Sequence, residues 1–238
     1  MSQKGRYEIK YLITYADYID ISTKLKGFVF LDDNTGDNDE YFIRSLYFDD
    51  IYSTSYTSKI NGDNDRKKYR IRIYNYLDDK ILFERKEKHN NTVIKTSFPL
   101  KRFQYEQLMM NNYEVLCDLE HPLAKEIYAN HTALDLKPSV VVDYDRTAFV
   151  HPLSNTRITF DKNLRAGINS FDIFNEEMNT LHIFQNDSVI MEIKYDSYLP
   201  DHLSSILSTV YGQKTALSKF CMCKNVLGHV NLKDAIYY

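Results

Sequence analysis

The 238-residue sequence predicts an α+β fold built on an antiparallel eight-stranded barrel, with charged side chains inside and helices packed outside. Helix-like and strand-like segments follow one another without the regular βαβ rhythm of a parallel sheet. Tyrosine is abundant, with 20 residues, and favours strands, whereas the 7 glycines and 5 prolines are too few for a disordered chain. Neither a repeat nor a long linker divides the sequence, so we expect a single domain over residues 1–238.

Eight segments have strand character because they alternate or are rich in β-branched and aromatic residues. They are residues 6–13, 41–49, 67–76, 81–88, 92–99, 138–150, 156–161 and 188–195. Helices are expected at residues 16–28, 101–111, 121–133, 200–211 and 222–228. Residues 32–40 and 175–187 are expected to be loops, 61–65 a turn, and 77–80 the turn of a hairpin. Residues 50–59 are ambiguous, since they are rich in Tyr and Ser but stand where a helix fits.

The composition excludes several classes of protein. The net charge is only −3, so the chain as a whole does not attract nucleic acid, and any anion site must come from local arrangement. Neither an apolar run of membrane-spanning length nor a signal peptide is present, so a cytoplasmic protein is expected. Three cysteines cannot form a disulfide framework, and Cys221 and Cys223 are expected to be buried thiols.

Charged residues recur at every second position of the predicted strands. Side chains two residues apart share a face, so Lys68, Arg70 and Arg72 lie on the face opposite Ile71 and Ile73. The same alternation groups Glu8 with Lys10, Glu84 with Lys86 and Lys88, Arg157 with Asp161, and Glu192 with Lys194. A sheet with one solvated polar face is the simplest explanation of any single strand.

The pattern across the strands favours a second explanation. If the helices cover the apolar faces, the charged faces line the interior, which then needs water, a metal or a polyanion. Arginine forks and lysine ammonium groups suit phosphate oxygens, and interspersed carboxylates suit a divalent cation that bridges phosphates. The sequence contains neither a Walker lysine motif nor a G-x-G-x-x-G run, so a phosphate site would be built from strands.

Eight short motifs in a fixed order resemble the VTC domain, the polyphosphate polymerase domain of the vacuolar transporter chaperone family. This family lies within the triphosphate tunnel metalloenzyme superfamily. The motifs are RYEIKY at 6–11, RSLYFD at 44–49, YRIR at 69–72, FERK at 83–86, YDRTAF at 144–149, RITFD at 157–161, EIKY at 192–195 and SKF at 218–220. The superfamily often opens with Glu-x-Glu-x-Lys, but here Arg6 stands in place of the first Glu, which leaves Glu8 and Lys10 of that motif.

The resemblance implies transfer of the γ-phosphate of ATP, or of another nucleoside triphosphate, to inorganic polyphosphate or pyrophosphate, with Mn²⁺ or Mg²⁺. Nucleic acid is not an expected partner. The implied catalytic residues are Arg70, Arg72, Lys86, Arg146, Arg157 and Lys219. Those implied to bind phosphate are Lys10, Lys95, Tyr144 and Ser218, to which alternation adds Lys194. Glu192 and Glu8 would hold the metal.

Three alternatives stay open at this point. A hydrolase of the same fold would cleave tripolyphosphate or a nucleoside triphosphate, although a richer set of carboxylates would suit water activation better. A binding module would hold polyphosphate without turnover, and a barrel with a salt-bridged interior would bind no ligand. Glu84 and Asp161 are expected to hold arginines in place rather than to bind metal. His89 and His151 are expected to be ordinary surface residues.

Overall fold

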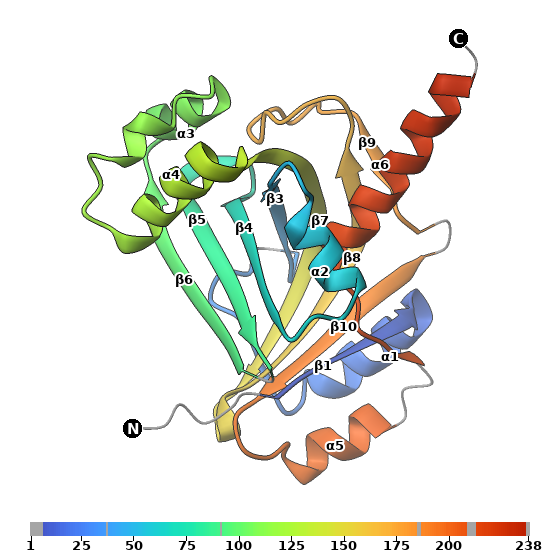
Figure 1. Cartoon of the computed structure of the whole chain (residues 1–238). Coiled ribbons are helices and arrows are strands. Elements are labelled where there is room, and N and C mark those ends of the chain that lie inside the picture. Colours follow the sequence, from blue (N-terminus) through green and yellow to red (C-terminus); the bar gives the residue numbers. More distant parts are fainter. Residues whose placement is uncertain (1–6, 37, 91, 185–186, 209–212, 237–238) are drawn as a thin grey trace. The chain divides into compact units, whose positions relative to one another are not determined.

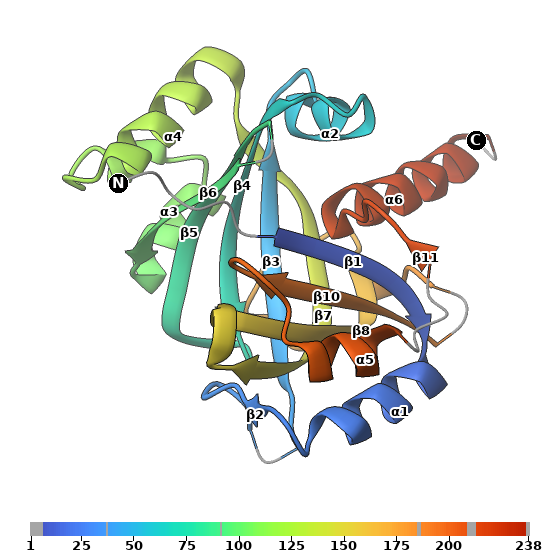
Figure 2. The same ribbon diagram turned by 90° about the horizontal axis from the view of Figure 1, so that it is seen from below.

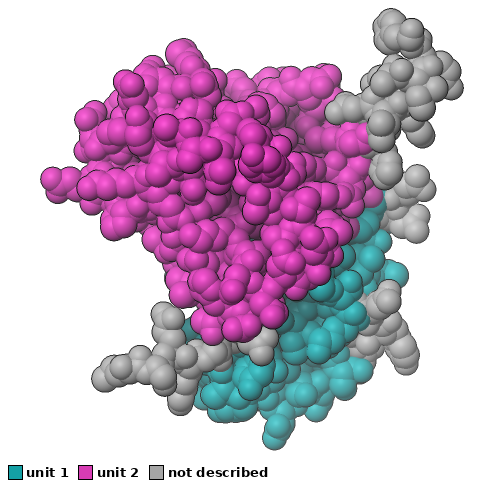
Figure 3. Space-filling model, in the orientation of Figure 1, with its two compact units in different colours: residues 1–42, 144–164, 184–217 teal, residues 43–143, 165–183, 218–238 magenta. Residues whose placement is uncertain are grey.

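The computed structural model describes residues 7–36, 38–90, 92–184, 187–208 and 213–236. Arg6, at the start of the predicted strand 6–13, and residues 209–211, at the end of the predicted helix 200–211, lie outside these ranges. Two compact units are present (Figure 3). Unit 1 comprises Met1–Phe42, Tyr144–Leu164 and Phe184–Leu217, and unit 2 comprises Ile43–Asp143, Arg165–Ile183 and Ser218–Tyr238. A single domain over residues 1–238 stays a prediction.

The strands follow the order β11-β1-β10-β8-β7-β3-β4-β5-β6, with β2 on β7 and β9 on β8. Their bounds are β1 Tyr7–Thr14, β2 Phe30–Leu31, β3 Tyr41–Asp49, β4 Asp65–Tyr74, β5 Leu77–His89, β6 Thr92–Leu100, β7 Lys137–His151, β8 Thr156–Gly167, β9 Thr180–His182, β10 Ser188–Tyr195 and β11 Gln213–Lys214. The strand pairs are antiparallel, which confirms the predicted α+β class. The order of the described strands has β11 and β6 at its ends and includes three short strands that the sequence did not indicate.

Unit 1 packs two helices on the apolar face of its strands. Figure 2 shows α1 (Tyr15–Leu25) and α5 (Asp201–Ser208) beside β1 and β10. The side chains of Ile21, Phe160, Met191 and Leu203 meet in a buried core. Helix α1 begins at Thr14, whose hydroxyl accepts the N–H of Asp17 at 3.1 Å while the Asp17 carboxylate accepts the N–H of Thr14 at 3.0 Å.

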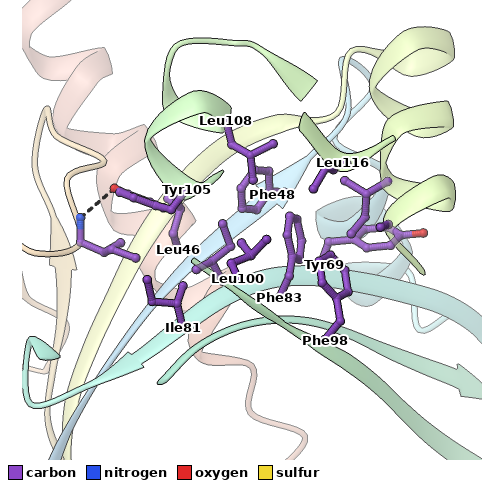
Figure 4. Packing of buried hydrophobic residues seen from close by; sticks show 14 of the residues in the cluster. Leu46, Phe48, Tyr69, Ile81, Phe83, Phe98, Leu100, Tyr105, Leu108 and Leu116 are labelled. Carbon is purple, nitrogen blue, oxygen red and sulfur yellow. Dashed lines mark hydrogen bonds between the residues drawn. The ribbon is translucent and has the colours of Figure 1, made fainter. Parts of the chain in front are cut away.

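Unit 2 repeats this arrangement with different helices. In Figure 1, α3 (Arg102–Met109) and α4 (Pro122–Leu134) lie over β4, β5 and β6. Beneath them Phe83 packs between Phe48 and Phe98, with ring centroids 5.0 and 5.7 Å apart (Figure 4). The hydroxyl of Tyr105 accepts the N–H of Ile173 at 3.1 Å, so a polar group ties a loop to this core (Figure 4). In both units helices cover the apolar strand faces, as expected.

The predicted hairpin turn at residues 77–80 is wrong. Tyr74 pairs with Leu77, so the turn consists of Asn75 and Tyr76 alone, with φ of 48° and 59°. Two residues with positive φ match the right-handed twist of a hairpin, and Asn tolerates this conformation well. The sequence did not indicate this turn, because tyrosine stands at its second position, where glycine is the usual residue.

Other boundaries also differ from the prediction. The ambiguous segment 50–59 contains α2, which spans Thr54–Ile60. The predicted loop 175–187 contains β9, and β8 continues beyond residue 161 to Gly167. The last helix, α6, spans Lys219–Ile236 and is longer than predicted. Single turns of 3-10 helix occur at Tyr113–Leu116 and Leu153–Asn155. Of the helices in the described ranges, none has the length and apolarity to cross a membrane.

Candidate functional site

Unit 1 carries a cluster of alternating charges on β1 and β10. The strand register places Lys10 opposite Glu192 and Glu8 opposite Lys194. The ammonium Nζ of Lys10 lies 3.0 Å from Oε1 of Glu8 and 3.6 Å from Oε2 of Glu192. Lys194 also contacts Glu192 and lies 3.9 Å from Glu8. Burial opposes the charge on Lys10, but Glu192 and Glu8 outweigh burial and raise the pKa of Lys10 above its ordinary value.

Arg146 on β7 is held by the fully buried carboxylate of Asp161 on β8. Its Nε and Nη2 donate to the two carboxylate oxygens at 2.6 and 2.8 Å, a bidentate pair. Burial opposes the charge on Arg146, but Asp161 outweighs it and raises the pKa of Arg146 well above the ordinary value. The guanidinium carbon lies 5.2 Å from the ring centroid of Tyr144, which is itself buried. Asp161 therefore holds an arginine, as expected.

Arg157 is held by two residues that the sequence analysis did not assign. Its Nη1 lies 2.7 Å from Oδ2 of Asp32, and its Nη2 donates to the hydroxyl of Tyr41 at 3.1 Å. Burial would raise the pKa of Asp32, but hydrogen bonds from Asn34 and the charges of Arg157 and Arg146 lower it. No sequence signal could have found Asp32, because it sits in an acidic stretch that is typical of a surface loop.

Unit 2 carries a second charged face, centred on Glu84 of β5. The Nε and Nη2 of Arg70 lie 2.7 and 2.6 Å from Oε2 of Glu84, and the Nε of Arg72 lies 4.0 Å from it. Lys95 of β6 contacts the other carboxylate oxygen. Burial would raise the pKa of Glu84, but Arg70, Arg72 and Lys95 outweigh it and lower the pKa to about 2. Glu84 thus holds two arginines, as expected.

The start of α6 adds further groups to this face. The ammonium of Lys68 donates to Oγ of Ser218 at 2.8 Å, and this oxygen also accepts the N–H of Cys221 at 3.3 Å. Ser218 therefore caps the helix that begins at Lys219. The buried ring of Phe220 stacks on that of Tyr47 with centroids 5.1 Å apart. These contacts connect the start of α6 to β3 and β4.

Tyr47 belongs to this face although the sequence analysis gave it no role. Its hydroxyl accepts a hydrogen bond of 2.9 Å from Nη1 of Arg70. Burial would raise the pKa of Tyr47, but Arg70, Arg72 and Lys68 outweigh it and lower the pKa to about 8. The sequence could have indicated this role, because Tyr47 lies in the RSLYFD motif and is two residues from Ser45, so the two side chains share a face. The Oγ of Ser45 accepts a hydrogen bond from Arg72.

The structure thus divides the predicted site residues between the two units. Unit 1 brings together Glu8, Lys10, Arg146, Arg157, Glu192 and Lys194, with Tyr144 beside Arg146. Unit 2 holds Arg70, Arg72, Lys86, Lys95, Ser218 and Lys219. Lys86 is half-buried on β5, directly opposite both Lys68 and Lys95. Cys221 and Cys223 are buried free thiols, as predicted.

The carboxylates fit a divalent cation only in part. Within the ranges that the structure describes, no group of three or more His, Cys, Asp or Glu side chains is placed to hold a metal. Glu192 and Glu8 are close enough to share the ammonium of Lys10. Mg²⁺ in enzymes is often bound by one or two carboxylates together with substrate phosphates. These two glutamates therefore fit a cation that phosphate oxygens also hold, and do not form a complete protein cage.

The fold and the charged faces define the chain as an antiparallel α+β protein whose strands carry faces of charged side chains. Comparison with known families gives the particular assignment, because the VTC domain matches residues 5–227. The chain belongs to the VTC domain family. No curated protein matches it.

The fold is similar to that of one solved structure. A putative adenylyl cyclase from Hippeastrum, with a dominant triphosphatase activity, is similar with a TM-score of 0.57 at 12% identity, over 92% of this chain and 96% of that one. A putative adenylate cyclase from Bacillus halodurans has a TM-score of 0.46 at 14% identity, over 86% and 88% of the two chains. The first similarity shows that the chain shares the fold of that protein.

Proposed function

We propose that this chain is a polyphosphate polymerase, which transfers the γ-phosphate of ATP or a related nucleoside triphosphate to a growing polyphosphate chain. The observation that carries the proposal is the face of unit 2, where Arg70, Arg72 and Lys95 contact one carboxylate, that of Glu84, and Lys86 stands on the same face opposite Lys95. Such an excess of positive charge on adjacent strands suits a ligand with many negative charges in a row. The family assignment supports the same class of ligand.

Each unit has its own part in this proposal. In unit 2, the forks of Arg70 and Arg72 and the ammonium groups of Lys86, Lys95 and Lys219 bind phosphate oxygens, and the hydroxyl of Ser218 adds a hydrogen bond. In unit 1, Lys10, Lys194, Arg146 and Arg157 bind phosphates, and Tyr144 supports Arg146. The carboxylates that hold the arginines fix their forks in advance of binding, which lowers the entropic cost of ordering them.

The transfer needs no nucleophile from the protein. A terminal oxygen of the acceptor chain forms a bond to the γ-phosphorus, the bond to the bridging β–γ oxygen breaks, and the nucleoside diphosphate leaves. The cationic side chains neutralise charge on the transferred group and keep the two oxygens in line. Glu192 and Glu8 would hold a divalent cation, Mn²⁺ or Mg²⁺, whose chemistry is to offset charge on the leaving diphosphate.

Triphosphate hydrolysis is the second candidate. It is favoured by the similarity to the Hippeastrum protein, whose dominant activity is that of a triphosphatase. A hydrolase must activate water, yet the carboxylates Glu84, Asp161 and Glu192 are all engaged by cations. We therefore place hydrolysis second and binding without turnover third.

One assay separates these candidates. The full chain is incubated with ATP and Mn²⁺ or Mg²⁺, with and without a polyphosphate primer, and the products are separated on a gel. We expect chain growth, and we expect Arg70→Ala and Glu192→Ala to lower its rate by about 100-fold or more, the scale of losing one electrostatic contact in a transition state. Arg102→Ala is the control, because Arg102 is an exposed residue of α3 paired with Glu106.

Release of orthophosphate without chain growth would assign the chain to the hydrolases, and binding without either product would assign it to the binding modules. Full activity in Glu192→Ala would remove the metal role of that residue. Circular dichroism of each variant shows whether a loss of activity reflects a loss of fold.

A further inference from the structure

Unit 2 contains a cavity that the proposed function does not use. Its volume is about 790 Å³, within the range of sites that hold small organic ligands. It lies at the C-terminal end of α4, beside the 3-10 turn Tyr113–Leu116 and close to the end of β3. Its lining includes Ile51, Tyr113, Glu114, His131, Leu134 and Asp135. None of the lining residues is one to which we assign phosphate binding.

Helix α4, which supplies much of the lining, packs on the other side of the sheet from the proposed phosphate site. Its Glu126 contacts Lys67, Tyr69 and Arg85. These residues alternate along β4 and β5 with Arg70 and the other residues of the phosphate face, and so they point to the opposite face. The cavity is therefore a separate feature of unit 2.

The hydroxyl of Tyr113 is buried in the wall of this cavity without a hydrogen-bond partner. Only 2% of the residue is exposed, and no group in the described ranges donates to the hydroxyl oxygen or accepts from it. The ring is fixed, because it stacks on His131 with centroids 3.7 Å apart and planes inclined by 5°. Burial raises the pKa of Tyr113 above its ordinary value, and the charge of Asp135 raises it further. A buried hydroxyl without a partner costs free energy, and native proteins contain few of them.

The charged and polar groups of the lining are mostly hydrogen-bond acceptors. Glu114 and Asp135 supply carboxylates. Nδ1 of His131 donates to the carbonyl of Leu136 at 3.1 Å, which leaves Nε2 as an acceptor in the neutral ring. Helix α4 ends here, and the C-terminal end of a helix carries partial negative charge. Lys and Arg are absent from the lining that the described residues form. The cavity therefore suits a cation that donates several hydrogen bonds.

Apolar side chains complete the lining. Ile51 and Leu134 are 57% and 38% exposed. The N–H of Ile51 donates to the carbonyl of Leu134 at 3.1 Å, which ties the segment after β3 to the end of α4. The half-buried ring of Tyr128 adds an aromatic surface. Apolar walls with a few polar groups are typical of sites for small organic molecules.

We propose that this cavity, here called the α4 cavity, binds a small organic amine in its protonated form. The ammonium group has three donors, which suit the two carboxylates and the unpaired hydroxyl of Tyr113. The apolar body of the amine would cover Ile51 and Leu134. Lys137 competes for Asp135 at 2.6 Å, but both partners are exposed and such a pair contributes little stability. Anions are a poor match, because the two carboxylates repel them.

The test compares three probes of similar shape on the full chain. They are 2-phenylethylamine, which is a cation, 2-phenylethanol, which is neutral, and 3-phenylpropanoate, which is an anion. We expect the amine to bind with a Kd of about 1 mM or lower, as suits a ligand of its size, and about fivefold or more tightly than the alcohol. The anion should bind more weakly than both. Changes in the NMR shifts of backbone amides should centre on Thr132 and Ala133, which line the cavity.

The double variant Glu114→Gln/Asp135→Asn tests the carboxylates. Asn tolerates the positive φ of 51° at position 135, so the end of α4 should keep its conformation. Affinity for the amine should fall about tenfold or more, and affinity for the alcohol should change less than about twofold. The matched control is Glu106→Gln/Asp118→Asn, which changes the net charge equally at two exposed positions outside the lining. It should leave both affinities within about twofold of the parent's.

Tyr113→Phe tests the unpaired hydroxyl and keeps the ring. Affinity for the amine should fall about fivefold, since the variant lacks one acceptor for the ammonium group. The denaturant midpoint of the free protein should stay the same or rise, because phenylalanine has no hydroxyl to leave unpaired. A hydroxyl with a purely structural role would give the opposite pair of results, a lower midpoint with unchanged affinity.

Several results would overturn the proposal. The α4 cavity is not an amine site if the alcohol or the anion binds as tightly as the amine, or if the amine binds more weakly than about 10 mM. The same holds if the double variant behaves like its control, or if the NMR changes centre on another part of the chain. Tighter binding of a lysine-rich peptide than of the amine would assign the cavity to a protein partner. None of these results affects the polymerase proposal, which rests on other residues.

Discussion

The polar faces of the two units differ in how their charges are balanced. In unit 1, the cations Lys10, Lys194, Arg146 and Arg157 are matched by the carboxylates Glu8, Glu192, Asp161 and Asp32. In unit 2, one face of β4, β5 and β6 carries Arg66, Lys68, Arg70, Arg72, Lys86, Lys88 and Lys95 together with the carboxylate of Glu84, and Asp49 of the neighbouring strand β3 pairs with Lys224.

The two faces therefore suit different roles, one in positioning and one in binding a polyanion. The alternation of charged residues in the sequence is the same in both and does not distinguish these roles. A balanced face is stable by itself and keeps each arginine in a fixed orientation. A cationic face gains stability when a polyanion arrives, by mass action on the folded state. Under the proposed function, unit 1 would therefore supply positioning and the carboxylates for a cation, and unit 2 most of the affinity for phosphates.

The largest expected effect on the free energy of unfolding comes from removing a buried carboxylate that pairs with a cation in unit 1. Asp161→Asn leaves the buried Arg146 without its bidentate partner, so the free energy of unfolding should fall by about 3–5 kcal/mol. Denaturant unfolding measures this change. Asp135→Asn is the control, since Asp135 pairs with Lys137 at an exposed position and should cost less than about 1 kcal/mol. A loss of similar size in both variants would contradict the special role of the buried pair.

A smaller loss in the free energy of unfolding is expected when a carboxylate is removed from unit 2. Glu84→Gln should lower the free energy of unfolding by about 1.5–3 kcal/mol at neutral pH, since the accessible ends of Arg70 and Lys95 regain water. The pKa of Glu84 in the fold, about 2, lies below the ordinary 4.5, so its contribution is complete above pH 4.5 and is lost as the pH falls towards 2. Unfolding curves of parent and variant should therefore converge in acid. A difference that persists at pH 2 would have a cause other than ionisation.

The smallest effect concerns Tyr47. Its pKa of about 8 means that a phenolate forms beside Arg70 as the pH rises through 8, and cancels one positive charge of the face. Affinity for tripolyphosphate should then fall by about 0.5–1 kcal/mol, roughly two- to fivefold. Tyr47→Phe should lack this step, and bound tripolyphosphate should raise the pKa of Tyr47 in the parent. Ultraviolet difference absorbance of tyrosinate follows the titration, and identical pH profiles of parent and variant would rule the effect out.

Alternation alone placed Lys68, Arg70 and Arg72 on one face and Glu192 with Lys194 on another, because the direction of a side chain in a strand depends only on its position in that strand. The order of eight motifs likewise identified the family that the comparison confirms. Both are local properties of the chain, and so they can be found in the sequence.

The tertiary structure decided which faces meet. The row Lys68, Lys86 and Lys95 depends on the register of three strands, and the pairing of β4 with β5 shifts between Arg72 and Tyr74, beside a turn at Asn75 and Tyr76 that the sequence did not reveal. Asp32 reaches Arg157, and Phe220 stacks on Tyr47, from segments more than a hundred residues away. Such contacts follow from the free energy of the whole fold rather than from local preference, so the balance of charge on each face could not be counted before the structure was known.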